Sequence, residues 1–562
     1  MLKKWLTFLY CLCSTTIFAQ QATAPVFSLA AAHPTDTVPE NLYFAGPYAS
    51  SYHAVYDKQL AQTLRITITD SVPRSPGLMI LQKLPLPVSA GGKLFLRIQA
   101  RGKHMQQVQL SCAIMNKTET IVGRLSAVSS FANGWQTFII QGNIPSDAVY
   151  IAPILQIDGP GEWRLSSMTA TMNGKPLHQW LDQQYIATAT ASRLSLQPFT
   201  PAAFGDTMLS GHIPRILAIG EYCHGAASNI HAYTNIAQQV LTKGAYNAVT
   251  LEIGVDVALH IDKYVNGDSS ENIAALLKLC GWHMNNQEIL DFLQWIRNYN
   301  ATHPSPIHVM GMDMQLPFLA ISELAGDSSL GPAMVAAVTN IGEIAEEMLS
   351  GMKVDTATLH TAQYHFQQLV ATAHTDKATL LKMHQVAQFL ELCSRQGKPD
   401  FNGRHIFEQG GFRDSCMAVN LRNALQDTSI RAVLIAHNAH LMKLQGMAGG
   451  YLQQYFGSDY VMVMSLIGAG NYFYAWNYAT QQALTAALPA IPIGSLEYNI
   501  TKNNHEPGWL SLHSPEFEKR YRHNILGVHQ NKAVNYSWNI VPAEQADYMI
   551  YLPQTTPAAT LH

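Results

Sequence analysis

Six side chains that can move protons or polarise a carbonyl group follow four short apolar runs of this sequence. They are Glu221, His224, Glu252, Asp313, His437 and His440. Each apolar run is typical of a buried strand, and the carboxyl ends of parallel strands meet at one edge of a sheet, where ligands bind. A single buried acid is more often a structural hydrogen-bonding group. Four coinciding strand ends favour a functional site instead.

These residue types suit hydrolysis by an activated water. A histidine with a pKa of about 6.5 can take a proton from water at neutral pH when a carboxylate fixes its tautomer and stabilises the imidazolium. His224 meets this requirement, with Glu221 or Glu252 as its acidic partner. We expect His437 and His440 to polarise the carbonyl or to hold the oxyanion.

Three other chemistries compete with this interpretation. A serine nucleophile is disfavoured because the sequence contains no GxSxG elbow. Cys223 precedes His224, but adjacent residues on extended backbone point to opposite sides, so a small buried side chain is the favoured interpretation. A metal ion could use Glu221, His224, His437 and His440, although no HExxH helix is present. We expect no metal and no cofactor, and keep a metal-dependent hydrolase as an alternative.

The elements that would position these residues alternate between strands and helices. This alternation predicts an α/β fold with a mostly parallel sheet flanked by helices and interrupted by a helical insertion. Asn285 or Asn286 can cap one of the helices. The expected strands span residues 215–220, 248–253, 307–313, 431–436 and about 460–465, the first helix spans about 229–242, and the insertion spans about 331–394.

The segment before this alternation is rich in strands and turns. Residues 94–100, 108–113 and 135–141 are typical strands, separated by Gly- and Asn-rich turns. This pattern predicts a β-sandwich over residues 25–179, which is either a carbohydrate-binding module or a spacer. The break near residue 180 predicts a catalytic domain over residues 181–562.

The first residues predict an export signal. Lys3 and Lys4 precede the short apolar run 5–18, and Ala19 offers a cleavage site, so residues 1–19 are expected to be removed. Lipidation at Cys11 or Cys13 is the less favoured alternative. No later apolar stretch reaches membrane-spanning length, so we expect a periplasmic or secreted protein without a transmembrane segment.

Composition excludes several partners and scaffolds. The net charge is −3 and no Lys/Arg cluster stands out, so a nucleic-acid partner is not expected. Five cysteines remain after the signal, an odd number without a CxxC pair, which excludes a disulfide-dense scaffold. Their spacing does not select disulfide partners, and nothing in the sequence indicates an oligomeric state.

The residues just described also resemble a known family. Gly220-Glu221-x-x-His224-Gly225 resembles the GExxHG motif of the erythromycin esterases, and the resemblance extends over about residues 185–555. Other matching motifs lie at residues 249–252, 262–267, 282–288, 311–315, 413–420, 436–440 and 546–557. The resemblance implies a metal-independent hydrolase in which His224 activates water, with Glu221 and Glu252 as acidic partners and His437 and His440 lining the cleft.

One position departs from the family pattern. Tyr233 stands where relatives commonly carry an Arg or Lys, which removes an expected contact to a substrate oxygen or to Glu252 and argues against macrolide cleavage. We expect Tyr233, Asp313 and Arg413 on the substrate side of the site. The sequence thus predicts an exported hydrolase of a small-molecule or glycan ester or lactone. The alternatives are a non-catalytic glycan or small-molecule binding protein on the same fold and the metal-dependent hydrolase.

Overall fold

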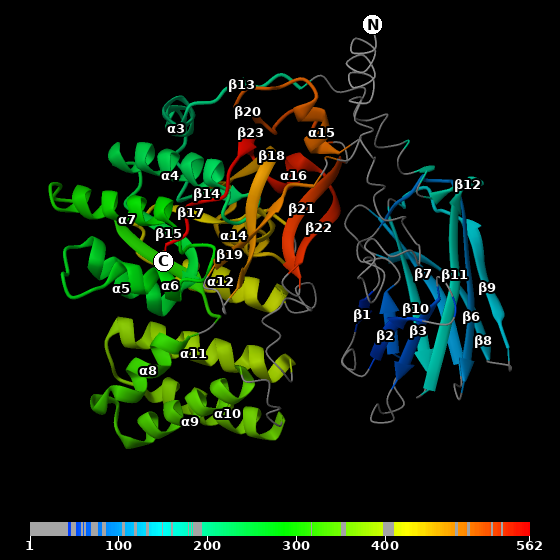
Figure 1. The fold of residues 1–562 in the computed structure, drawn as a ribbon, viewed down its shortest axis with the longest axis horizontal. Coiled ribbons are helices and arrows are strands. Elements are labelled where there is room, and N and C mark those ends of the chain that lie inside the picture. Colours follow the sequence, from blue (N-terminus) through cyan, green and yellow to red (C-terminus); the bar gives the residue numbers. More distant parts are fainter. Residues whose placement is uncertain are drawn as a thin grey trace, which may run out of the picture. The chain divides into compact units, whose positions relative to one another are not determined.

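The structure is a computed structural model of the 562-residue chain. It describes residues 43–561 except 46–51, 58–59, 61–62, 69–76, 81–85, 104–106, 117–120, 131–133, 149, 159–160, 178, 181–182, 184–193, 316, 350–355, 397–409, 445, 478–481, 490, 492–494, 519–520 and 530–531. The predicted export signal lies outside the described residues. The chain divides into two compact units, Met1–Ala187 and Thr188–His562 (Figure 1).

The first unit is an antiparallel β-sandwich, as predicted. One sheet has the order β1-β4-β10-β7-β8, with β5 beside β10, and the other has the order β2-β3-β11-β6-β9, with β12 beside β11. The first sheet comprises β1 (Tyr43–Ala45), β4 (Gly77–Ile80), β5 (Leu86–Pro87), β7 (Gln107–Met115), β8 (Ile121–Ser130) and β10 (Tyr150–Asp158). The second comprises β2 (Tyr52–Tyr56), β3 (Leu64–Ile68), β6 (Lys93–Lys103), β9 (Gln136–Asn143), β11 (Gly161–Met172) and β12 (Lys175–Pro176).

Alternation along the strands explains why this sandwich forms. In β6 the even-numbered Leu94, Leu96 and Ile98 are fully buried, whereas the odd-numbered Lys93 and Arg97 are exposed. Successive side chains of a strand point to opposite faces, so one face of the sheet joins the core and the other meets solvent.

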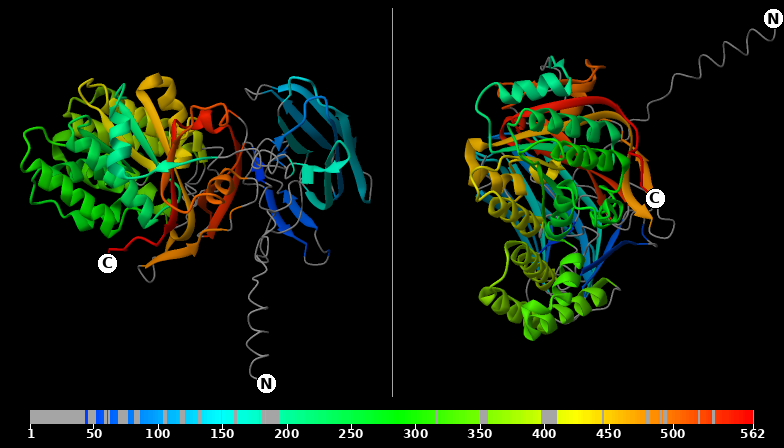
Figure 2. Two further views of the ribbon diagram at one scale, coloured as in Figure 1. Left: turned by 90° about the horizontal axis from the view of Figure 1, so that it is seen from above. Right: turned by 90° about the vertical axis from the view of Figure 1, so that its left-hand side faces the viewer.

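The second unit is built on a nine-stranded sheet flanked by helices (Figure 2). Its order is β13-β20-β23-β18-β14-β17-β15-β16, with β19 beside β18. The six strands from β23 to β16 are parallel, and β13, β20 and β19 pair antiparallel. The strands are β13 (Gln197–Pro198), β14 (Ile216–Glu221), β15 (Ala248–Gly254), β16 (His308–Asp313), β17 (Ala432–His437), β18 (Tyr460–Asn477), β19 (Gln482–Ala487), β20 (Gly508–Ser511) and β23 (Tyr548–Thr555).

The predicted mostly parallel sheet is therefore confirmed. Every residue of the adjacent strands β14 and β17 is buried, as expected for parallel strands covered on both faces. The fifth expected strand runs on from Ser465 to Asn477, because its second half pairs with β23 and then with β19. The flanking helices are α3 (Pro201–Leu209), α4 (Ala227–Thr242), α5 (Val255–Val265), α6 (Ile273–Leu279), α7 (Gln287–Asn300), α12 (Gly410–Ala424), α13 (Asn438–Leu441) and α14 (Ala448–Phe456). Asn286 is the N-cap of α7, and its side chain accepts a hydrogen bond from the backbone N–H of Ile289.

The predicted helical insertion is present, begins earlier than expected and, in the part that the structure describes, consists of four helices. It comprises α8 (Phe318–Gly326), α9 (Pro332–Leu349), α10 (Thr356–Thr372) and α11 (Lys377–Gln396), which share a core around Val338, Phe366 and Phe389. A single helix over 331–394 would be far longer than its apolar face could bury, whereas a bundle of shorter helices buries each face against its neighbours.

The remaining described elements follow β18. They are α15 (Leu496–Thr501), the hairpin of β21 (Tyr521–His529) and β22 (Lys532–Ile540), and α16 (Pro542–Gln545), together with 3₁₀ turns at Ser328–Leu330 and Gly457–Asp459. Among the residues that the structure describes, no helix is both long and apolar enough to cross a membrane.

Candidate functional site

The parallel register brings the polar strand ends together. Glu221 at the end of β14 lies opposite His437 at the end of β17, and β15 next to β17 carries Glu252. Asp313 ends β16, the neighbour of β15. The four strands are adjacent in the sheet, so their carboxyl ends form a single edge, as parallel pairing requires.

Two glycines allow the turn after β14 to take its shape. A Cβ at Gly220 would lie 2.0 Å from Oδ1 of Asn438, so only glycine lets the chain pass this side chain. Gly225 has a φ of +60°, and a Cβ there would lie 2.1 Å from the Phe473 ring. The backbone N–H of Phe473 also donates to the His224 carbonyl, which fixes the turn against β18.

His224 is hydrogen-bonded to a buried carboxylate. Its Nδ1 lies 2.7 Å from Oε2 of Glu221, and the two side chains are 20% and 5% exposed. Burial alone would lower the pKa of His224, but the charge and hydrogen bond of Glu221 outweigh it, so the pKa is raised. Burial raises the pKa of Glu221, and the charge of His224 partly offsets this. Because Nδ1 faces the carboxylate, Nε2 of the neutral ring is left as the base.

Three aromatic rings surround His224. His283 lies 4.7 Å away between ring centroids, His437 lies 5.1 Å away, and Trp282 approaches edge-on at 5.4 Å. Burial, reinforced by the charge of His224, lowers the pKa of His283 to about 4 and that of His437 to about 3. His283 and His437 are therefore neutral imidazoles, and both lie beside His224, whose pKa is raised.

The tautomer of His437 follows from its hydrogen bond. The backbone N–H of Ala439 donates to Nδ1 of His437 at 3.1 Å, so the proton of the neutral ring is assigned to Nε2. The carbonyl of Leu526 on β21 approaches this ring, but Nε2 makes no hydrogen bond to any described residue. A buried N–H donor is thus available beside His224.

Arg413 of α12 holds the opposite half of the site together. Its Nη2 lies 2.8 Å from Asp313 and 3.1 Å from Glu252, its Nε lies 3.1 Å from Asp313, and its Nη1 lies 3.0 Å from Nε2 of His440. Burial opposes ionisation of Glu252, but the positive charges of His440 and Arg413 hold its pKa well below the usual range. The pKa of Asp313 is also lowered, because Arg413 outweighs burial there.

This network gives Glu252 a cationic partner. The replacement at Tyr233 was expected to remove a contact to a substrate oxygen or to Glu252, and in the structure the Arg413 guanidinium pairs with Glu252. Glu252 also accepts a hydrogen bond from the backbone N–H of His437 at 2.9 Å. Glu221, rather than Glu252, is the hydrogen-bond partner of His224.

The predicted site residues differ in the exposed fraction of their side chains, and so in their accessibility to a ligand. His224, Arg413 and His440 have side chains that are 20%, 18% and 15% exposed, and these form the open part of the site. Tyr233 on α4 is only 2% exposed, and burial, reinforced by the charge of Glu221, raises its pKa well above the usual value, so it lies beneath the site as a neutral phenol rather than on its surface. The Asp313 side chain is likewise only 10% exposed, and it forms an ion pair with Arg413.

Three residues were missed by sequence reasoning. Asp414 accepts from Nδ1 of His440 at 2.8 Å and orients that ring. Trp282 and His283 belong to a matching motif, but they follow a helix rather than a strand, so they are not among the polar residues at the strand ends. His283 could have been predicted from its residue type, because it is an ionisable side chain within a segment that matches the family motif.

Cys223 does not behave as a nucleophile. It is buried, and burial raises the pKa of its thiol well above the usual value, with the charge of Glu221 adding to the shift. Cys112, Cys223, Cys280, Cys393 and Cys416 are all buried free cysteines.

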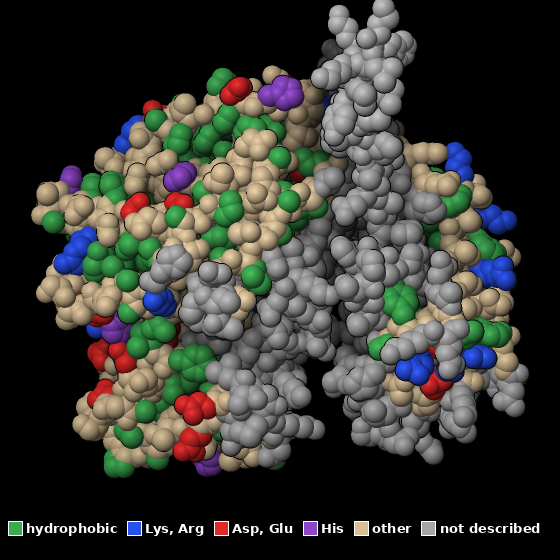
Figure 3. Space-filling view, viewed as in Figure 1, with side chains coloured by type: hydrophobic (Ala, Val, Ile, Leu, Met, Phe, Trp, Pro, Cys, Tyr) green, Lys and Arg blue, Asp and Glu red, His purple; other side chains and the backbone are tan. Residues whose placement is uncertain are grey.

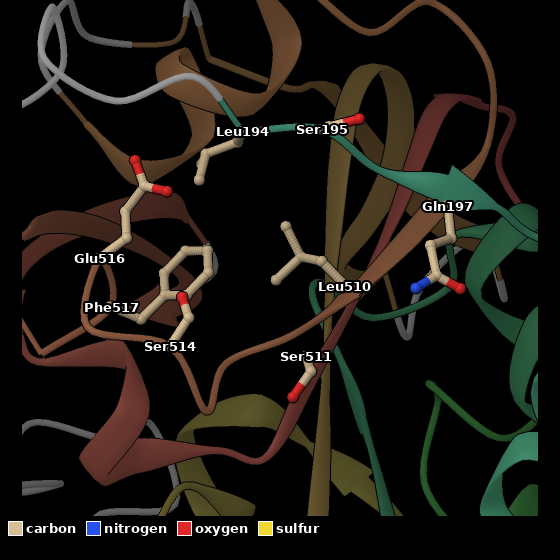
Figure 4. Close-up of a pocket in the computed structure, with 8 residues that line it drawn as sticks. All are labelled: Leu194, Ser195, Gln197, Leu510, Ser511, Ser514, Glu516 and Phe517. Atoms are coloured by element: carbon tan, nitrogen blue, oxygen red, sulfur yellow. The ribbon is translucent and has the colours of Figure 1, made fainter.

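No described group of three or more His, Cys, Asp or Glu side chains has the geometry to hold a metal ion. A surface pocket elsewhere in this unit is lined by residues around β13 and β20, among them Leu194, Leu510, Ser511 and Phe517 (Figure 4). None of the His224 site residues lines that pocket.

Comparison with known families decides the identity of this unit. The erythromycin esterase family matches residues 241–555, which is more than half of the chain. The chain belongs to the erythromycin esterase family. This is a family of carboxylic-ester hydrolases, and the matched segment contains Glu252, Asp313, Arg413, His437 and His440. The Glu221–His224 turn lies just before the matched segment.

Solved structures of low sequence identity share the fold of this erythromycin-esterase unit. A Bacillus cereus protein is 18% identical, with a TM-score of 0.54 over 68% of this chain and 99% of its own. A succinoglycan biosynthesis protein is 16% identical, with a TM-score of 0.54 over the same shares. A mutant of the erythromycin esterase EreC in its open conformation is 15% identical, with a TM-score of 0.51 over 65% of this chain and 99% of its own. No curated protein matched the sequence.

Proposed function

We propose that this protein is an exported hydrolase that cleaves a carboxylic ester or lactone with a water activated by His224. The observation that carries the proposal is the 2.7 Å hydrogen bond between His224 Nδ1 and the buried Glu221 carboxylate. A base held in one tautomer by a buried acid is the arrangement that proton abstraction from water requires.

Each step of the reaction has a residue to perform it. His224 Nε2 takes a proton from water, and the hydroxide attacks the carbonyl carbon of the ester. The oxyanion of the tetrahedral intermediate accepts a hydrogen bond from the Nε2–H of His437, whose lowered pKa keeps it a neutral donor. The His224 imidazolium, stabilised by Glu221, then returns its proton to the departing alkoxide.

The Arg413 network supports the rest of the site. Arg413 and His440 are partly exposed and carry donors that suit a polar group of the substrate. Glu252 and Asp313 hold the guanidinium from two strands and so fix its direction. In this proposal they orient Arg413, while Tyr233 is a buried neutral residue beneath Glu221.

We propose a glycan ester, or another cell-surface or environmental ester, as the substrate. The positively charged start and short apolar run of residues 1–19 support export. The Tyr at position 233, in place of a cation, argues against a macrolide lactone as the natural substrate.

The test is a panel of p-nitrophenyl esters, lactones and acylated glycans assayed with the wild type and with His224→Ala. His303→Ala is the matched control, because His303 is exposed beyond the end of α7, just before β16 begins, at the opposite edge of the sheet. We expect hydrolysis that disappears in His224→Ala, survives in His303→Ala and resists a chelator.

The other outcomes select the alternatives. Loss of hydrolysis on chelation, with recovery on adding Zn²⁺ or Mn²⁺, would support a metal-dependent hydrolase. A folded wild type that hydrolyses nothing in the panel, but whose Tm rises with an acylated glycan, would support a binding protein.

A further inference from the structure

The outer face of the second sandwich sheet carries an excess of cations. Residues of β6 that alternate with its buried ones point outward, and among these Lys93 and Arg97 are exposed. The register places Arg65 of β3 opposite Arg164 of β11, and Arg164 opposite Arg101 of β6. We call the outward side of the β2-β3-β11-β6-β9 sheet, with Arg65, Lys93, Arg97 and Arg101, the basic face.

Among the described residues of this unit, few acidic side chains pair with these charges. Arg164 forms ion pairs with Asp57 and Glu162. The structure records no ion pair with a described residue for Lys93 or any of the other arginines of the basic face. Like charges directly opposite in a sheet are destabilising, and the chain as a whole carries a net charge of −3. Asp57 and Glu162 compensate Arg164 in the middle of the row, so Arg65 and Arg101 on either side of it are the charges that a bound anion would neutralise.

An exposed tryptophan lies at the edge of the basic face. Trp135, just before β9, is 38% exposed, and the Arg101 guanidinium lies 4.9 Å from the centroid of its ring. The cation–π contact fixes the indole in place. Ile139 on β9, opposite Arg97, is 46% exposed. An immobilised aromatic surface next to unpaired cations is suited to the apolar face of a sugar ring.

On β6 the outward side chains between the cations are Phe95, which is half-buried, and Gln99. Gln99 and Thr137 are opposite each other on β6 and β9, and Thr169 of β11 lies opposite Arg97. Outward residues along a strand repeat every ~6.6 Å, so Lys93, Arg97 and Arg101 lie about 13 Å apart in turn. This face presents separated cations with hydrogen-bonding groups between them. Figure 3 shows Lys and Arg side chains on the visible part of this unit, with Asp or Glu between two of them.

We propose that the basic face binds an anionic polysaccharide. Its arginines and lysine pair with carboxylates of the polymer, the amides and hydroxyls bind sugar hydroxyl groups, and Trp135 packs on a sugar ring. Non-specific single-stranded nucleic acids are held by a charged groove together with several stacked aromatic side chains. One exposed Trp among amides and hydroxyls favours a sugar polymer instead. The inference does not depend on the chemistry at His224.

The test uses the full-length protein and polygalacturonate as the probe. Affinity electrophoresis in gels containing polygalacturonate at low salt should retard the wild type, while neutral dextran should not. We expect Arg97→Glu and Trp135→Ala each to weaken binding about five-fold or more, and added salt to abolish it. Both side chains are exposed, so neither change disturbs the core.

Arg124→Glu is the matched control, because Arg124 is an exposed arginine on β8 of the other sheet and gives the same change in net charge. It should bind like the wild type. Equal losses in Arg97→Glu and Arg124→Glu would reduce the effect to net charge and overturn the proposal. Equal retardation by dextran, no retardation by polygalacturonate, or tighter binding to oligo(dT) would overturn it as well.

Discussion

The rings of His283 and His437 lie 4.7 and 5.1 Å from that of His224, and the three rings differ in their affinity for a proton. The pKa of His224 is raised by Glu221, whereas those of His283 and His437 are lowered by burial and by the His224 charge. Such separation of pKa values is how one site supplies both a base and a neutral hydrogen-bond donor. At the residue scale, protonation is therefore what distinguishes the roles of these rings.

Glu221→Gln should shift the pH dependence of hydrolysis. The base form of His224 is populated above its pKa, which the Glu221 charge raises; removing that charge lowers the pKa. The acidic limb of kcat/KM should therefore move to lower pH, while the plateau falls by about 10²-fold because the ring loses its orienting acceptor. Rates on an activated ester from pH 5 to 9 measure both effects. A limb that stays in place would contradict the assignment of Glu221 as the partner.

His283 should make folding stability depend on pH. Its pKa is near 6.5 in the unfolded chain and about 4 in the folded protein. Between those values the unfolded state binds a proton that the folded state does not, so the free energy of unfolding falls as pH drops through this window. In His283→Asn the slope from pH 6.5 to 4 should be smaller by up to about 1.4 kcal/mol per pH unit. Urea unfolding at several pH values tests this, and an unchanged slope would refute it.

Arg413→Ala should be strongly destabilising. The substitution leaves the buried carboxylates of Glu252 and Asp313 without their cation, and removing one partner of a buried ion pair costs about 3–5 kcal/mol. Arg422→Ala is a control on the same helix, where an exposed guanidinium packs on Tyr455, and should cost less than about 1 kcal/mol. Similar losses for both variants in urea unfolding would show that the network contributes little.

At the scale of elements, the last residues of the chain brace two loops of the site. The backbone N–H groups of Ala227 and Ala558 pair with the carbonyls of Thr556 and Gly225, beside His224. Further along, the N–H of Gln287 donates to Ala559, and Asn286 pairs with Thr560, both next to the loop of Trp282 and His283. The segment 556–561 thus connects the two loops that bring His224 and His283 together.

Deleting residues 556–562 should impair catalysis more than folding. The segment adds few buried side chains, so we expect a small change in Tm, but kcat/KM should fall about ten-fold because the two loops lose their shared support. Hydrogen exchange should increase at residues 222–228 and 282–289. Unchanged exchange at these residues would show that the loops hold their shape without the segment.

Sequence patterns predicted the elements better than the contacts between them. Runs such as Ile216–Gly220 are apolar throughout, and Asn286 is a recognisable cap, so local chemistry specifies the strand and the helix start. The pairing of Arg413 with Glu252 joins positions 161 residues apart across the insertion, and no local pattern encodes it. His283 was not predicted for a related reason. Its position beside His224 depends on the conformation of the loop after α6, which no local pattern encodes.

At the scale of the whole molecule, the His224 site and the basic face belong to different units. Every residue of the site comes from Thr188–His562, and the basic face comes from Met1–Ala187. The two activities are therefore expected to be separable.

A protein comprising residues 188–562 should retain hydrolysis of a p-nitrophenyl ester and lose binding to polygalacturonate. We expect kcat/KM within about two-fold of the full chain, because no site residue is removed and domains of this kind carry their own core. A large loss of activity, with circular dichroism showing a folded protein, would mean that the first unit contributes to catalysis.

The position of β23 in the sheet has a consequence for the order of assembly. This strand, Tyr548–Thr555, lies between β18 and β20, so each of these two strands keeps an unpaired edge until β23 is in place. The segment that braces the His224 turn follows directly after it. Insertion of β23 therefore completes the sheet and brings the brace to the His224 turn in the same step. A partly folded chain without β23 in place would expose strand edges that can pair with a second copy.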